Sequence, residues 1–145
     1  MKVDVINEEF SITVYGFSGV AINNNYGETG SRLMKKMWEH VSANKIPNKG
    51  INIWVYETGG KLLTGVELED MPPLGTGLEL KKVNLEKYAY YKHVGPYHQL
   101  SKVYPELTAE LDKKGLIKCF PWLEIYGHWN KDESKLETEI LICLK

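Results

Sequence analysis

Two carboxylates stand in a segment that otherwise has the pattern of a buried strand. In Leu136–Leu144 (LETEILICL), every second residue from Leu136 onward suits a core, while Glu137 and Glu139 belong to the other face. Glutamate is uncommon in strands and costs free energy when it is buried. The pattern therefore favours a binding or catalytic role for Glu139, whereas a solvated side chain is the favoured interpretation for Glu137 near the strand end.

Two earlier strand-like segments carry aromatic residues in the same alternating manner. Side chains alternate between the two faces of a strand, so Ile53 and Val55 belong to one face and the residues between and after them to the other. We expect the aliphatic face to pack against helices, and the opposite face to be open or cupped. That open face would gather these side chains: Trp54, Tyr56, Trp122, Glu124, Tyr126, Glu137 and Glu139.

Aromatic rings around a carboxylate suit a flat organic cation. Stacking of a cation on Trp or Tyr is worth about 0.5–2 kcal/mol for each contact. A carboxylate in an aromatic cup loses hydration, and a cationic ligand offsets that cost whereas a neutral one does not. Glu139 is the preferred carboxylate because its neighbours across the sheet are expected to be aromatic. Gly65 stands at the corresponding position of the first half, so the repeat itself does not require a carboxylate there. A second core or a subunit contact is the alternative for the aromatic residues.

The segments that must position these residues form an internal repeat in the sequence. Trp54–Val55–Tyr56 aligns with Glu124–Ile125–Tyr126, 70 positions later, and residues 62–68 align with 136–142, 74 positions later. The preceding segments share an apolar helix stripe at the offset of 70. In the first copy this stripe is Leu33, Met34, Met37 and Val41, and in the second it is Val103, Tyr104, Leu107 and Leu111.

Each copy is predicted to form a strand, a helix and two strands. The first copy has a strand within 10–22, a helix over 28–43, and strands at 51–57 and 62–68. The second has a strand or hairpin in 78–94, a helix between 99 and 114, and strands at 121–126 and 136–144. This order predicts one α+β domain over 1–145, with pseudo-repeats at 1–70 and 78–145. We expect a mostly antiparallel sheet with two helices on one face and the ligand pocket on the other.

Composition argues against several other classes of protein. The net charge of −1 provides no field that would attract nucleic acid, and no apolar run approaches the ~20 residues of a membrane span. The N-terminus has no signal-peptide pattern, so a cytoplasmic protein with reduced Cys119 and Cys143 is expected. Neither the histidines nor the cysteines have metal-ligand spacing, and no phosphate-binding loop is present, so we predict no metal and no cofactor.

Three motifs in the second half resemble the GyrI-like, or AraC effector-binding, domain family. They are YAYYKHVGPYHQL (Tyr88–Leu100), FPWLEIYGHW (Phe120–Trp129) and LETEILICLK (Leu136–Lys145). The resemblance implies a tandem of two strand-helix-strand-strand units, with a concave pocket that holds lipophilic cations in multidrug-binding regulators.

The resemblance also assigns roles to residues of this chain. It implies a buried glutamate anchor on the closing strand at Glu139 and a pocket tyrosine at Tyr126. Tyr90 is a further candidate from the first motif, whereas Trp54, Tyr56 and Trp122 are placed by strand alternation alone. The regulators attach this domain to a DNA-binding domain, for which 145 residues leave no room. The chain therefore looks like a stand-alone member, a kind also found on mobile gene cassettes.

The favoured interpretation is a binding module for amphipathic, cationic aromatic compounds. One alternative is a metal-free hydrolase that opens strained rings of DNA-alkylating compounds, with Glu139 or Glu124 as acid or base and Tyr126 polarising the electrophile. Another is a protein that acts on a protein partner, as gyrase inhibitors do. A homodimer is a further alternative.

Overall fold

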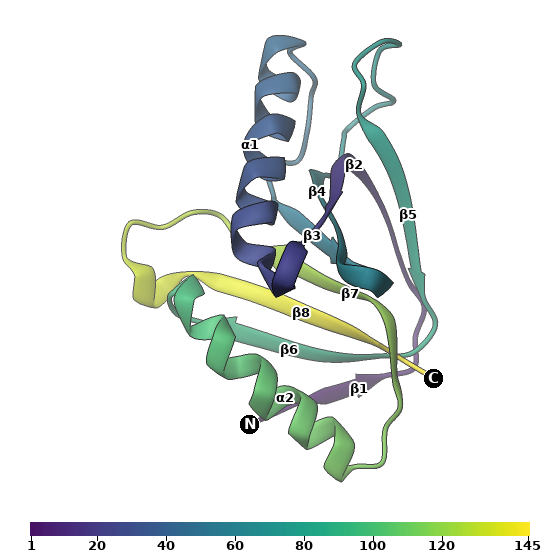
Figure 1. The fold of residues 1–145 in the computed structure, drawn as a ribbon, viewed down its shortest axis with the longest axis vertical. Helices are drawn as coiled ribbons and strands as arrows, with labels where there is room; N and C mark the ends of the chain where they lie inside the picture. Colours follow the sequence, from purple (N-terminus) through teal and green to yellow (C-terminus); the bar gives the residue numbers. More distant parts are fainter.

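The computed structural model describes residues 1–145 as two α-helices and one eight-stranded antiparallel sheet (Figure 1). Short 3-10 turns join several of these elements. In chain order the elements are β1 (Asp4–Ile6), β2 (Phe10–Val20), α1 (Tyr26–Ala43), β3 (Ile53–Tyr56), β4 (Lys61–Val66), β5 (Glu79–Leu85), β6 (Tyr88–Val94), α2 (Leu100–Lys113), β7 (Lys118–Tyr126) and β8 (Glu137–Leu144).

The strand order is β1-β6-β8-β7-β3-β4-β2-β5, which is symmetric about its centre. The inner strands of the second half, β6-β8-β7, stand beside those of the first half, β3-β4-β2, and the two halves meet where β7 pairs with β3. The predicted α+β class and the two strand-helix-strand-strand units are confirmed. The outer strands are exchanged, because β1 pairs with β6 of the second half and β5 pairs with β2 of the first.

Both helices form where the repeated apolar stripe predicts them. Leu33, Met37 and Val41 are buried on α1, and α2 buries its stripe at the corresponding positions. Residues four apart share one helix face, so each helix presents a single apolar surface to the sheet. Gly115 follows α2 with a φ of +70°, a conformation that glycine adopts readily at the end of a helix.

The sheet is a curled half-barrel, and it has a core on each face. On the helix-covered face, one cluster surrounds α1 and another surrounds α2, the latter including Ile140 and Ile142 of β8. On the helix-free face, strands of both halves contribute to a single cluster. It is formed by Ile12, Val14, Ile53, Val55, Leu63, Val83, Leu85, Tyr88, Leu123 and Leu141.

The predicted orientation of β3 and β7 is wrong. Ile53 and Val55 were expected against the helices, but together with Leu123 of β7 they belong to the helix-free cluster. Trp54 instead lies against α1, where a Cβ at Gly30 would overlap its ring. The physical reason is the curl of the sheet, which encloses a second apolar core and so makes both faces of these strands hydrophobic.

The two cysteines form a disulfide between β7 and β8, so the prediction of two reduced thiols is wrong for this structure. Cys119 and Cys143 are 24 residues apart in sequence, but their Cα atoms lie 4.9 Å apart. Adjacent antiparallel strands produce this proximity, which sequence spacing alone does not reveal. Neither helix has the length and apolar composition that a membrane crossing requires.

Candidate functional site

A cavity of about 820 Å³ lies on the helix-covered face and is lined by residues of α1, α2, β3 and β7. Its lining is strongly aromatic, with five tyrosines, two tryptophans and one phenylalanine. It contains one carboxylate, Glu124, and neither lysine nor arginine. The cavity therefore combines a hydrophobic wall with a single acidic group.

Three tyrosine hydroxyl groups donate hydrogen bonds to Glu124. Tyr56 and Tyr126 donate to Oε1 at 2.6 Å each, and Tyr104 donates to Oε2 at 2.5 Å. The Glu124 residue is only 2% exposed, and none of the salt bridges of the protein includes it. Hydrogen bonds to a charged acceptor are short and strong, so the three donors hold the carboxylate in a fixed position.

The environment keeps these three tyrosines in their neutral, donating form. Burial is the largest cause that raises the pKa of Tyr56, Tyr104 and Tyr126 well above the ordinary value, and the charge of Glu124 raises the pKa further. A tyrosinate would place a second negative charge beside the first in a region of low dielectric constant. The cavity thus contains neutral phenols around one acidic group.

Phe120, Trp122 and Tyr104 form a stack of nearly parallel rings, here called the aromatic ladder. The ring centroids of Phe120 and Trp122 are 5.5 Å apart with planes inclined by 13°, and those of Trp122 and Tyr104 are 6.1 Å apart at 14°. Phe120 is 47% exposed, whereas the Tyr104 hydroxyl reaches Glu124. The aromatic ladder therefore runs from the rim of the cavity to its carboxylate.

Trp54 forms the part of the cavity wall that packs against α1. Its ring meets that of Tyr126 edge to face at a centroid distance of 5.7 Å, and the residue is 7% exposed. Gly30 of α1 has no side chain, and this leaves the space that the six-membered ring of Trp54 occupies. Close packing of helix and sheet at this glycine sets the position of the indole.

Five of the seven predicted site residues line the cavity: Trp54, Tyr56, Trp122, Glu124 and Tyr126. They come together as expected from alternation, but on the helix-covered face of the sheet. The predicted placement of the pocket on the face without helices is therefore wrong for this cavity. Their part in ligand binding stays a prediction.

Glu139 and Tyr90 lie on the opposite face of the sheet from the cavity. Glu139 is paired with Ile125 across the β7–β8 ladder, so it shares the face of Ile125 and not that of Glu124. Its Oε2 accepts a 2.5 Å hydrogen bond from the Tyr90 hydroxyl, and Tyr90 packs against the helix-free cluster. Glu139 was expected to anchor the aromatic cavity, from the family resemblance and from a shared face with Glu124, but it does not line this cavity.

The sequence pattern did not identify Tyr104 as part of the site. It was counted with the apolar stripe of α2, at the position that Met34 holds in α1, and Met34 also lines the cavity. A tyrosine within an aliphatic helix stripe carries a hydroxyl that needs a partner when buried. That requirement is the signal that could have placed it beside a carboxylate.

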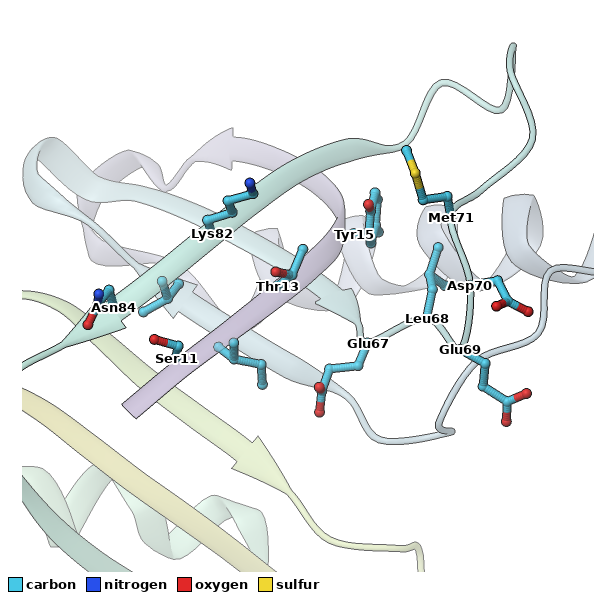
Figure 2. A pocket seen from close by; sticks show the side chains of 12 residues that line it. Ser11, Thr13, Tyr15, Glu67, Leu68, Glu69, Asp70, Met71, Lys82 and Asn84 are labelled. Atoms are coloured by element: carbon cyan, nitrogen blue, oxygen red, sulfur yellow. The ribbon is translucent and has the colours of Figure 1, made fainter. Parts of the chain in front are cut away.

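A second, more open groove of about 570 Å³ lies along β2 and β5 (Figure 2). Figure 2 shows Thr13 and Lys82 on these strands and the acidic side chains of Glu67, Glu69 and Asp70 on the segment that follows β4. Glu67 already pairs with Lys49 at the surface. The groove lacks a buried charged group, so the aromatic cavity is the stronger candidate site.

No protein-family model matches the sequence, and no curated protein sequence matches it. Solved structures do match over almost the entire chain. The C-terminal domain of EcmrR has a TM-score of 0.75 at 16% identity, covering 100% of this chain and 99% of the other. SAV2435, in a structure bound to tetraphenylphosphonium, has a TM-score of 0.64 at 15% identity, with coverage of 100% and 94%.

A hydrolase from Listeria innocua also matches, with a TM-score of 0.59 at 12% identity and coverage of 99% of this chain and 92% of the other. At such low identity the likeness concerns the fold alone. These neighbours fit the GyrI-like fold that the sequence resemblance implies, and the chain has the same α+β architecture as they do.

Proposed function

We propose that the chain binds amphipathic aromatic cations in the cavity between its two helices, with Glu124 as the countercharge. The observation that carries this proposal is a carboxylate only 2% exposed, in an aromatic cavity without a cationic side chain. Trp54, Tyr56, Trp122 and Tyr126 supply the surfaces on which an aromatic ligand packs. Glu124 takes the role for which the sequence favoured Glu139.

The energetics of a buried carboxylate favour a cationic ligand over a neutral one. Removing a carboxylate from water costs several kcal/mol, and the hydroxyls of Tyr56, Tyr104 and Tyr126 offset part of this cost. A cation in the cavity offsets more of it through attraction to Glu124 and to the ring faces. A micromolar affinity needs about −8 kcal/mol in total, which these contacts and the burial of apolar surface can supply.

Intrinsic tryptophan fluorescence during titration tests the proposal. The probe is tetraphenylphosphonium, chosen because a protein of the same fold was solved with it, and triphenylphosphine oxide is the neutral comparison. We expect saturable quenching by the cation and an affinity at least about tenfold weaker in Glu124→Gln, equivalent to about 1.4 kcal/mol. Equal binding of both compounds, or equal affinity of the variant, would remove the carboxylate from the proposal.

Glu139→Gln is the matched control for this experiment. It removes a carboxylate that also accepts a tyrosine hydrogen bond, but on the face opposite the cavity. We expect its affinity for tetraphenylphosphonium to equal that of the wild type. An effect as large as that of Glu124→Gln would mean that overall charge, and not the cavity, governs the affinity.

The hydrolase alternative is less well supported by the geometry. A tyrosine that polarises an electrophile must donate its proton to the substrate, yet the hydroxyls of Tyr56, Tyr104 and Tyr126 all donate to Glu124. Turnover of a strained-ring compound that is lost in Glu124→Gln would favour hydrolysis over binding. Action on a protein partner rests on the sequence resemblance alone.

A further inference from the structure

One end of the strand that carries Glu124 lacks regular pairing. In the β7–β8 ladder, Lys118 lies opposite Leu144 and Trp122 lies opposite Ile142, so four steps along β7 match two along β8. The β3–β7 ladder extends only to Trp122. Residues 119–121, here called the bulge segment, therefore have no ladder partner on either neighbouring strand.

The disulfide joins the bulge segment to β8, although no backbone pairing does so. It joins Cys119, the first residue of the bulge segment, to Cys143 of β8. Cys143 packs against the cluster on the helix-free face, whereas Phe120 lines the cavity on the helix-covered face. The bond thus attaches the bulge segment to β8 on the side facing away from the cavity. Both cysteines are partly exposed, so they can react without a reagent entering the cavity.

A chain of contacts connects this bond to the carboxylate. The Cys119 carbonyl accepts a 2.7 Å hydrogen bond from the Trp122 indole N–H. The Trp122 ring stacks between Phe120 and Tyr104, and the Tyr104 hydroxyl donates to Glu124 at 2.5 Å. The backbone of Cys119 therefore helps to fix the aromatic ladder that forms one wall of the cavity.

We propose that Cys119–Cys143 is a reversible thiol–disulfide site that sets the affinity of the cavity for its ligand. The oxidised form holds the bulge segment on β8 and keeps the aromatic ladder in place. The reduced form releases this segment, so Phe120 and Trp122 lose their fixed position and cation binding weakens. This inference rests on the proposed function of the cavity.

The reaction partner is a dithiol. Its thiolate attacks one cysteine sulfur, which breaks the protein disulfide and forms a mixed disulfide. Its second thiol then displaces the protein sulfur, leaving two cysteine thiols and an oxidised dithiol. Two electrons and two protons pass to the protein in total, and the reverse reaction restores the bond.

Reciprocal coupling gives the proposal a second, independent measurement. If the oxidised form binds the ligand about tenfold more tightly, the ligand must stabilise the disulfide by the same factor. For this two-electron couple, a tenfold factor makes the midpoint potential more negative by about 30 mV. A disulfide that merely strengthens the fold would change thermal stability but would produce neither effect.

The test measures the affinity for tetraphenylphosphonium before and after reduction with dithiothreitol, under conditions where far-ultraviolet circular dichroism shows folded protein. We expect about tenfold weaker binding after reduction, together with the reciprocal shift in midpoint potential. The variant Cys119→Ser/Cys143→Ser should bind tetraphenylphosphonium with the affinity of the reduced protein, and dithiothreitol should not change that affinity. Equal affinities of the oxidised and reduced wild type would overturn the proposal, as would complete unfolding on reduction.

Failure of the proposed function gives a different result from failure of this inference. If even the oxidised wild type does not bind the cation, the proposed function fails. Whether the disulfide controls the aromatic ladder is then decided by measuring the order of these rings directly. Near-ultraviolet circular dichroism reports that order, and comparison with Trp122→Phe isolates the contribution of Trp122. Loss of this contribution on reduction supports control by the disulfide, and an unchanged signal overturns it.

Discussion

Trp54 and Glu124 lie directly opposite each other in the β3–β7 ladder, and they occupy corresponding positions of the two repeats. The neighbouring pairs obey the same relation, since Ile53 is paired with Ile125, which is the counterpart of Val55. The seam between the repeats therefore runs through the cavity. One repeat contributes an indole and the other a carboxylate, so a symmetric scaffold carries an asymmetric site.

Gly30→Ala tests the packing that positions Trp54. A Cβ at Gly30 would overlap the Trp54 ring, so the indole must move or α1 must shift. We expect the free energy of unfolding to fall by about 1–3 kcal/mol, measured by urea denaturation. Gly27→Ala is the matched control in the same helix, because no atom lies within 4 Å of its added Cβ. Because Gly27 lies in the first turn of α1, the substitution should change the free energy of unfolding by less than about 0.5 kcal/mol.

Tyr104→Phe tests the hydrogen bonds that hold Glu124. The substitution removes one donor and leaves an oxygen of a buried carboxylate without it. We expect a loss of about 1–3 kcal/mol in the free energy of unfolding. Tyr90→Phe also removes a hydroxyl that donates to a glutamate, but at the more exposed Glu139, so its cost should be clearly smaller. Equal losses in both variants would mean that burial of Glu124 adds no penalty.

Alkaline pH should destabilise the protein through the same cluster. The pKa values of Tyr56, Tyr104 and Tyr126 are raised in the folded state, so these groups stay protonated while an unfolded chain ionises near pH 10. Their contribution to stability is present below pH 10 and is lost as the pH rises above it. Each should subtract about 1.4 kcal/mol for each pH unit above 10. Absorbance at 295 nm should show these tyrosines ionising only as the protein unfolds.

Reduction of Cys119–Cys143 should lower the global stability as well as the ligand affinity. The bond closes a loop with a sequence separation of 24 residues, and the chain-entropy model gives such a cross-link about 3.5 kcal/mol. Urea denaturation with and without dithiothreitol measures this difference. The reductant should leave the stability of Cys119→Ser/Cys143→Ser unchanged, which separates the effect of the bond from other effects of the reagent.

The repeat and the helices could be predicted from the sequence because they depend on local pattern. The apolar stripes of α1 and α2 recur at a fixed offset, and they are buried where the spacing places them. The aromatic and acidic residues of the site also shared one face, as alternation requires. These features need only the period of a helix or a strand.

The remaining features depend on contacts between distant segments. Alternation separates Ile53 and Val55 from Trp54 but does not say which set meets a helix, since the curled sheet has apolar residues on both faces. The same reversal grouped Glu139 with the aromatic residues, although it lies on the opposite face of the sheet. The disulfide was missed because it depends on the extra residues at the bulge, which no periodic pattern reveals.

The exchanged outer strands make the two halves of the chain mutually dependent. β1 leaves the first half to cover the edge of β6, and β5 leaves the second half to cover the edge of β2. An uncovered strand edge exposes unpaired backbone groups that invite aggregation, so each half protects the other from this hazard. The arrangement is a domain swap contained within a single chain. Cutting the connection between the halves would therefore yield two complementing fragments, each lacking the strand that finishes its own sheet.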